Sequence, residues 1–99
     1  MKLFSSRVSE MDIYQKAEHV EWKIVENRMV LIDGREMELF HLNEVGAAVW
    51  ELIDGKKRVK EIETKVAAEF VAPLKQIHHD VTDFMKKLLE RELITRKND

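Results

Sequence analysis

The sequence predicts an α+β fold of the winged helix-turn-helix class, in which a three-stranded antiparallel sheet is followed by three helices. Three observations predict this class. The first half carries short runs of alternating apolar and polar residues, the second half carries three segments with helical periodicity, and residues 93–95 form a short apolar run typical of a strand. Residues 1–19 show no sustained period, so we treat them as an extension and expect residues 20–97 to form the domain.

The first two strands are expected on either side of a turn near Asn27. The run EWKIVE alternates, with Trp22 and Ile24 on one face, and MVLID gives the second strand. Asp33 and Gly34 then predict a tight hairpin turn, because both residue types tolerate positive φ.

The third strand is expected over EMELFHL, with Met37 and Leu39 on one side and Glu36, Glu38 and Phe40 on the other. The two glutamates could discourage edge-to-edge pairing of sheets. They could also form a pair of catalytic carboxylates, but the same spacing occurs on any solvated strand, and we favour the solvated interpretation.

Three helices are expected after the sheet. In HLNEVGAAVWELIDG, Asn43 is a good N-cap and Gly55 stands where a helix usually stops in the left-handed conformation. VKEIETKVAAEF predicts the second helix, and a third begins near Pro73, a residue type that suits the first turn of a helix.

The third helix shows two apolar rows. The core-facing row consists of Leu74, Ile77, Val81, Phe84 and Leu88. A second row, one position around the helix, consists of His78, Thr82, Met85 and Leu89. Together they cover more surface than one small core requires, so the second row either covers the sheet or the extension, or lines a groove. Such a groove beside the third strand could hold an extended peptide as an added strand.

Composition narrows the possible functions. The net charge is −2 with interleaved signs, which argues against a nucleic-acid partner, since phosphate binding needs a basic stripe. The chain has no cysteine, so disulfides and thiolate metal sites are excluded. It shows neither a membrane span nor a secretory signal, so a cytoplasmic location is expected. The sequence is compatible with both a monomeric and a homodimeric state.

No catalytic, metal or cofactor site is expected. His78, His79 and Asp80 are adjacent on a helix and point in different directions, so they cannot easily chelate one ion. His41 has no nucleophile placed beside it by the sequence, and the three isolated glycines form no phosphate-binding loop. Trp22 and Trp50 lie within apolar patterns and are interpreted as core or core-rim residues.

The run ELFHLNEVGAAVWELIDGKKRVKEI, followed by AAEF, a proline and DVTDFMKKLLERELI, resembles the PqqD-like proteins over residues 21–96. These are the peptide chaperones of pyrroloquinoline quinone biosynthesis and the recognition elements of ribosomally made, modified peptides. The resemblance implies a winged-helix domain without catalysis of its own. It also implies binding of a precursor (leader) peptide as an added strand and its presentation to a modifying enzyme, often a radical S-adenosylmethionine enzyme.

Carried onto this sequence, the resemblance implies a peptide site between the third strand and the third helix. The strand residues are Glu36, Met37, Glu38, Leu39 and Phe40. The helix residues are Ile77, His78, Val81, Thr82, Met85 and Leu89. Two positions depart from the family pattern: Arg58 replaces a capping threonine before the second helix, and Glu92 replaces a glycine after the third, which should cost some local stability.

Two other functions stay open at this stage. A winged-helix DNA-binding regulator would use the basic side chains of the third helix, namely Lys75, Lys86, Lys87 and Arg91. Such binding would depend strongly on salt, whereas strand addition would depend on it only weakly. A structural or oligomerisation module without a ligand is the third possibility.

Overall fold

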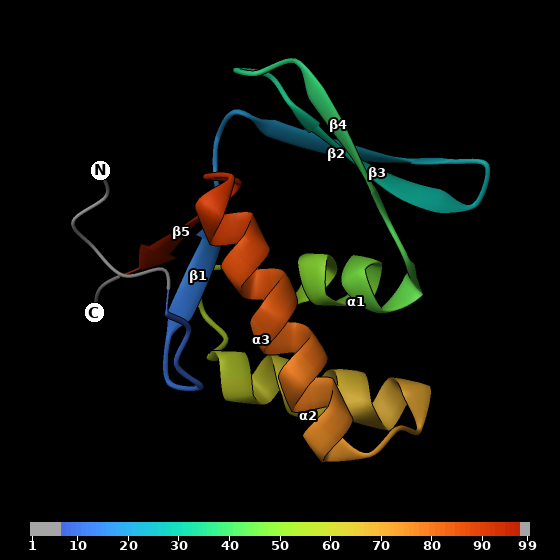
Figure 1. Cartoon of the computed structure of the whole chain (residues 1–99), viewed down its shortest axis with the longest axis vertical. Coiled ribbons are helices and arrows are strands. Elements are labelled where there is room, and N and C mark those ends of the chain that lie inside the picture. The colour runs from blue at the N-terminus through green and yellow to red at the C-terminus, as the bar shows by residue number, and fades with distance from the viewer. Residues whose placement is uncertain (1–6, 98–99) are drawn as a thin grey trace.

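Two antiparallel sheets flank three helices in the computed structural model, which describes residues 7–97 (Figure 1). The first six residues of the predicted extension lie outside this range. The elements in chain order are β1 (Ile13–Lys16), β2 (Val20–Val25), β3 (Arg28–Asp33), β4 (Glu38–Leu42), α1 (Glu44–Leu52), α2 (Val59–Phe70), α3 (Leu74–Glu90) and β5 (Ile94–Lys97). The predicted class, a three-stranded sheet followed by three helices, is confirmed.

The larger sheet has the order β2-β3-β4, with every neighbouring pair antiparallel. The β2–β3 turn uses Glu26 and Asn27, whose φ angles of 51° and 66° suit a two-residue hairpin. The next turn is longer than predicted. Asp33 pairs with Glu38, residues 34–37 form the loop, and Met37 rather than Gly34 has the positive φ, of 56°.

The reason for the longer loop is the side chain of Asp33, which is buried at the end of β3. Its Oδ1 accepts hydrogen bonds from the backbone N–H groups of Arg35 and Glu36, at 2.9 and 3.3 Å. Glu36 is therefore a loop residue, and the expectation that Glu36 and Glu38 share a strand face is wrong.

The helices begin where the sequence predicts. The Asn43 side chain accepts a 2.7 Å hydrogen bond from the N–H of Gly46 and caps α1. Helix α2 starts after Arg58, without a side-chain acceptor at the cap position. The carbonyls of Asp12 and Glu10 instead accept from its first two N–H groups, both at 2.9 Å.

The sequence did not predict strand β1, which lies within residues 1–19. It pairs with β5 in a second sheet, and Ile13, Tyr14 and Ala17 of this segment are buried. A four-residue strand whose partner lies about eighty residues away gives little local signal. β5 itself begins at Ile94 and ends at Lys97, slightly later than predicted.

The core lies between the larger sheet and the helices, with Trp50 fully buried at its centre. Trp22 stands at the rim, edge-on to Trp50 with ring centroids 5.6 Å apart, as predicted for both tryptophans. The buried row of α3 consists of Ile77, Val81, Met85 and Leu88. None of the helices within residues 7–97 combines the length and the apolar composition that a membrane span needs.

Candidate functional site

β4 is an edge strand of the larger sheet. It pairs with β3 on one side, and α3 runs past its other side (Figure 1). An edge strand exposes a row of backbone N–H and C=O groups that can pair with another chain. The space between β4 and α3 is therefore the first place to look for a binding site.

Two pockets occupy this space. The first, of about 370 Å³, is lined from β4 by Phe40, His41 and Leu42, and from α3 and its C-cap by Phe84, Lys87, Leu88, Glu90 and Arg91. The second, of about 380 Å³, extends toward the beginning of α1 and includes Asp80, Asp83 and Gly46. His41, Leu42, Phe84 and Lys87 line both pockets, so the two form one continuous groove, the β4–α3 cleft.

The β4–α3 cleft has an apolar floor and a charged rim. Phe40, Leu42, Phe84 and Leu88 supply apolar surface, and Phe40 and Phe84 are only partly buried. Phe84 also lies close to α1, because a Cβ placed on Gly46 would come within 3.6 Å of its ring. An apolar floor beside unpaired backbone groups suits an extended peptide, whose backbone pairs while alternate side chains enter the groove.

A salt bridge spans the β4–α3 cleft. The Arg91 guanidinium lies 3.4 Å from a carboxylate oxygen of Glu38 and 5.3 Å from the centre of the Phe40 ring. Both charged side chains are about half exposed, so the ion pair contributes at most about 1 kcal/mol and can open at little cost. Lys87 is paired with Asp83 on the same helix at 3.3 Å.

The predicted strand residues divide into two groups. Glu36 and Met37 lie in the β3–β4 loop and line neither pocket, and Met37 is 82% exposed. Glu38, Leu39 and Phe40 do lie on β4; Phe40 lines the cleft, while Leu39, next to it on the strand, points to the opposite face of the sheet. Whether a peptide contacts these residues stays a prediction.

The predicted helix residues lie mostly on other faces of α3. Ile77, Val81 and Met85 are fully buried in the core, Thr82 and Leu89 are partly buried, and His78 contacts α2. None of the six lines either pocket of the β4–α3 cleft. Met85 and Leu89 of this row pack in or against the core. Whether a peptide contacts any of the six stays a prediction.

The cleft residues that the sequence analysis did not place there are Phe84, Lys87 and Leu88 on α3, its C-cap Arg91, and His41 and Leu42 on β4. The sequence analysis assigns Phe84 and Leu88 to the core, which is confirmed for Leu88, while Phe84 is only partly buried; it assigns the two basic residues to a DNA surface. The available signal was their spacing: positions 84, 87, 88 and 91 share one helical face that is apolar at its centre and basic at its margin.

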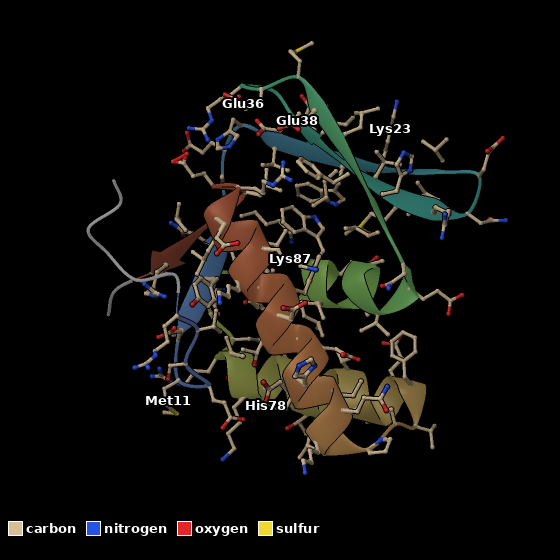
Figure 2. All side chains as sticks on the ribbon, viewed as in Figure 1. Met11, Lys23, Glu36, Glu38, His78 and Lys87 are labelled. Carbon is tan, nitrogen blue, oxygen red and sulfur yellow. The ribbon has the colours of Figure 1, made fainter. Side chains whose placement is uncertain are left out.

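His78 belongs to a second cluster, on the side of α3 turned toward α2 (Figure 2). Its Nδ1 lies 2.8 Å from an oxygen of Glu63, which is 1% exposed, and 3.5 Å from an oxygen of Glu10. Burial of Glu63, together with its hydrogen bond to Glu10, raises its pKa to about 7, although His78 acts in the opposite direction.

The basic residues of α3 do not favour a nucleic-acid surface. Lys87 pairs with Asp83 and Arg91 pairs with Glu38, so two of the four predicted DNA contacts are already engaged with carboxylates. Asp80 lines the same groove as Lys87. Interleaved charges of both signs do not produce the positive potential that phosphate binding requires.

A family model described as coenzyme PQQ synthesis protein D (PqqD) matches residues 28–94. Among solved structures, TbiB1 in complex with the TbiA(beta) leader peptide is 26% identical, with 86% of this chain and 99% of that chain covered and a TM-score of 0.74. Lasso peptide synthetase B1 complexed with the leader peptide is 17% identical, with 83% and 96% covered and a TM-score of 0.74.

A third similar structure is the solution NMR structure of the PqqD truncation of Methylobacterium extorquens PqqCD, which represents a stand-alone recognition element for ribosomally synthesised, post-translationally modified peptides. It is 22% identical, with 92% of this chain and 97% of that chain covered and a TM-score of 0.78. The two structures below 25% identity establish similarity of fold. A search of curated protein sequences found no match.

Proposed function

Because the chain belongs to the PqqD family, we propose that it binds the leader region of a ribosomally synthesised precursor peptide and presents that peptide to a modifying enzyme. The family match confirms the resemblance seen in the sequence. The TbiB1 structure, which shares the fold over 86% of this chain, holds a leader peptide and supports the proposal.

The observation that carries the proposal is the β4–α3 cleft beside the open edge of β4. A peptide strand there would pair with the backbone of Glu38–Leu42, and its alternate side chains would meet Phe40, Phe84 and Leu88. Backbone pairing supplies affinity for any extended chain, and the apolar floor supplies selectivity. The Glu38–Arg91 pair would open or re-pair with the peptide as it enters.

The protein acts in this proposal as a recognition module, and the chemistry belongs to its partner. We propose a peptide-modifying enzyme as that partner, with a radical S-adenosylmethionine enzyme as the specific candidate that the family suggests. We also propose the cytoplasm as its location, because ribosomes release precursor peptides there.

The proposal is tested by measuring the affinity of the protein for fluorescently labelled leader peptides encoded beside its gene. We expect Phe84→Ala to weaken binding about tenfold or more, because it removes the apolar surface at the centre of the cleft. Leu74→Ala is the matched control, since Leu74 is an exposed apolar residue of the same helix that lies outside both pockets.

Equal affinity of the Phe84 and Leu74 variants for the leader would contradict binding in the β4–α3 cleft. Salt provides a second criterion. If the peptide binds by strand addition, its affinity should change only slightly between low and moderate salt. A steep loss of affinity with salt would indicate that binding depends mainly on contacts between opposite charges.

A further inference from the structure

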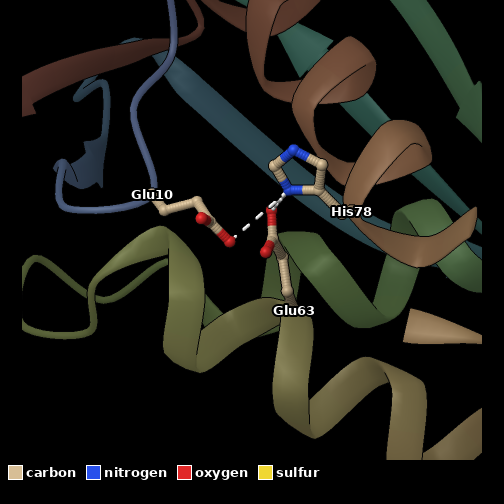
Figure 3. Close-up of side chains that lie close together, drawn as sticks. All are labelled: Glu10, Glu63 and His78. Carbon is tan, nitrogen blue, oxygen red and sulfur yellow. Dashed lines mark hydrogen bonds and ion pairs between the residues drawn. The ribbon is translucent and has the colours of Figure 1, made fainter. Parts of the chain in front are cut away.

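Three side chains from separate parts of the chain converge outside the β4–α3 cleft (Figure 3). Glu10 comes from the segment before β1, Glu63 from the middle of α2, and His78 from the first half of α3. One possible ligand atom from each lies within 4.8 Å of the others. Two carboxylates and an imidazole nitrogen thus face one small volume.

The backbone holds these three residues in place. Glu63 and His78 lie on packed helices, and the carbonyl of Glu10 accepts a 2.9 Å hydrogen bond from the N–H of Lys60 at the start of α2. The neighbouring carbonyl of Met11 accepts a 2.6 Å hydrogen bond from the Arg58 side chain. Glu10 is therefore fixed to the same helix that carries Glu63, which limits the cost of gathering the three groups.

We propose that Glu10, Glu63 and His78 form a binding site for a divalent transition-metal cation, with zinc as the best match. Tetrahedral ligands about 2.0–2.2 Å from zinc lie roughly 3.3–3.6 Å from one another. The Nδ1 of His78 lies 2.8 and 3.5 Å from the nearest oxygens of Glu63 and Glu10, so small side-chain rotations suffice. This set differs from His78, His79 and Asp80, which the sequence analysis considered and rejected.

The donor types select the class of metal. Two carboxylate oxygens and one imidazole nitrogen suit zinc or a similar transition metal, whereas magnesium and calcium prefer oxygen ligands alone. The side chains of Glu10 and His78 are both 48% exposed, so a fourth ligand can come from solvent. A cation there would also offset the unfavourable charge of the buried Glu63 carboxylate beside a second carboxylate.

The site would join the segment before β1 to two helices. The carbonyls of that segment already cap α2. A metal bound by Glu10 would add a second link between the segment and the helices. We therefore expect the metal to stabilise the fold by binding the folded state alone. This role is independent of peptide binding, because the cluster shares no residue with the lining of the β4–α3 cleft.

The experiment treats the full chain with a chelator, removes the chelator and titrates with Zn²⁺ by calorimetry, and with Co²⁺ by visible absorption. We expect one equivalent to bind, and the melting temperature to rise by roughly 10–20 °C at a zinc concentration 100-fold above Kd. A long-range ¹H–¹⁵N spectrum of the imidazoles should show a selective change at Nδ1 of His78.

Three variants and one control locate the ligands. His78→Gln, Glu63→Gln and Glu10→Gln should each weaken zinc binding about tenfold or more. His79→Gln is the control, because His79 is an exposed neighbour that lies 3.6 Å from Asp80 and outside the cluster. Glu10→Gln changes a half-exposed side chain, so the fold should survive even where Glu63→Gln perturbs it.

The proposal is overturned by the absence of zinc binding to the chelator-treated protein. It is equally overturned by binding that survives in both His78→Gln and Glu10→Gln, or that disappears in His79→Gln instead. Tight Ca²⁺ or Mg²⁺ binding without Zn²⁺ binding would also refute it, because the imidazole would then have no role as a ligand.

Discussion

Met85→Ala should cost the protein a large part of its stability, because the side chain has no exposed surface and lies in the core. Truncating a fully buried methionine typically costs about 2–5 kcal/mol, through lost apolar burial and the cavity left behind. A domain of 99 residues has a total free energy of unfolding of about 5–15 kcal/mol. The change should therefore remove roughly a third of it.

The assay is urea denaturation of the variant followed by circular dichroism, with thermal unfolding in parallel. A loss near 3 kcal/mol corresponds to a fall in melting temperature of roughly 12–24 °C for a domain of this size. Leu74→Ala is the control: this side chain is 56% exposed on the same helix, so its loss should change stability by about 0.5 kcal/mol or less.

The result that refutes this reasoning is a loss below about 1 kcal/mol for Met85→Ala. Met85 would then lie on an open face of α3, as the sequence interpretation placed it, and the core row of the helix would have to be rotated. A large loss would show in turn that Met85 is a poor probe of peptide binding, because changes there act on the stability of the core.

Three further predictions concern single side chains. Burial and the hydrogen bond to Asp12 raise the pKa of Tyr14 from 10.0 to about 12. The unfolded chain therefore loses the phenolic proton at a lower pH than the folded protein does. The free energy of unfolding should fall as the pH rises from 10 toward 12. As Tyr14 is the only tyrosine in the chain, tyrosinate absorbance reports it directly, and a midpoint near 10 in the folded protein would contradict the burial. Glu92→Gly should stabilise by about 0.5–1 kcal/mol in urea denaturation, because Glu92 has a φ of 60° that favours glycine; a destabilised variant would show that its contact with Arg35 matters more. Arg91→Ala should cost at most about 1 kcal/mol of stability in the same assay, and a loss above 2 kcal/mol would mean that the contact with Glu38 is part of the core rather than the rim.

The order of elements from β2 to β5 was predictable from the sequence because these elements have local signals. Asn43 caps α1, residues 59–70 have helical periodicity throughout, and Asp33 ends a strand. β1 could not be predicted, since its burial depends on a partner strand at the other end of the chain. The cap of α2 was hidden for the same reason: its acceptors are the carbonyls of Glu10 and Asp12.

The candidate site was only half predictable. The sequence indicated the strand, and Phe40 lies in the cleft as expected. The row of α3 that the sequence favoured does not line the two pockets. An apolar row beside a core row has the same periodicity in the sequence whether it is buried or exposed. What distinguishes Met85 from Phe84 is the rotation of the helix against α2 and the sheet, which depends on packing between elements distant in sequence.

The most direct test of the central claim is an NMR measurement of the labelled protein with a leader peptide encoded beside its gene. We expect intermolecular contacts between the peptide backbone and Glu38–Leu42, with shift changes at Phe84 and Arg91 and none at His78. This pattern is the signature of a strand added to the edge of β4. Contacts with β2 or with the α2 side of α3 instead would contradict the account and place the binding site elsewhere.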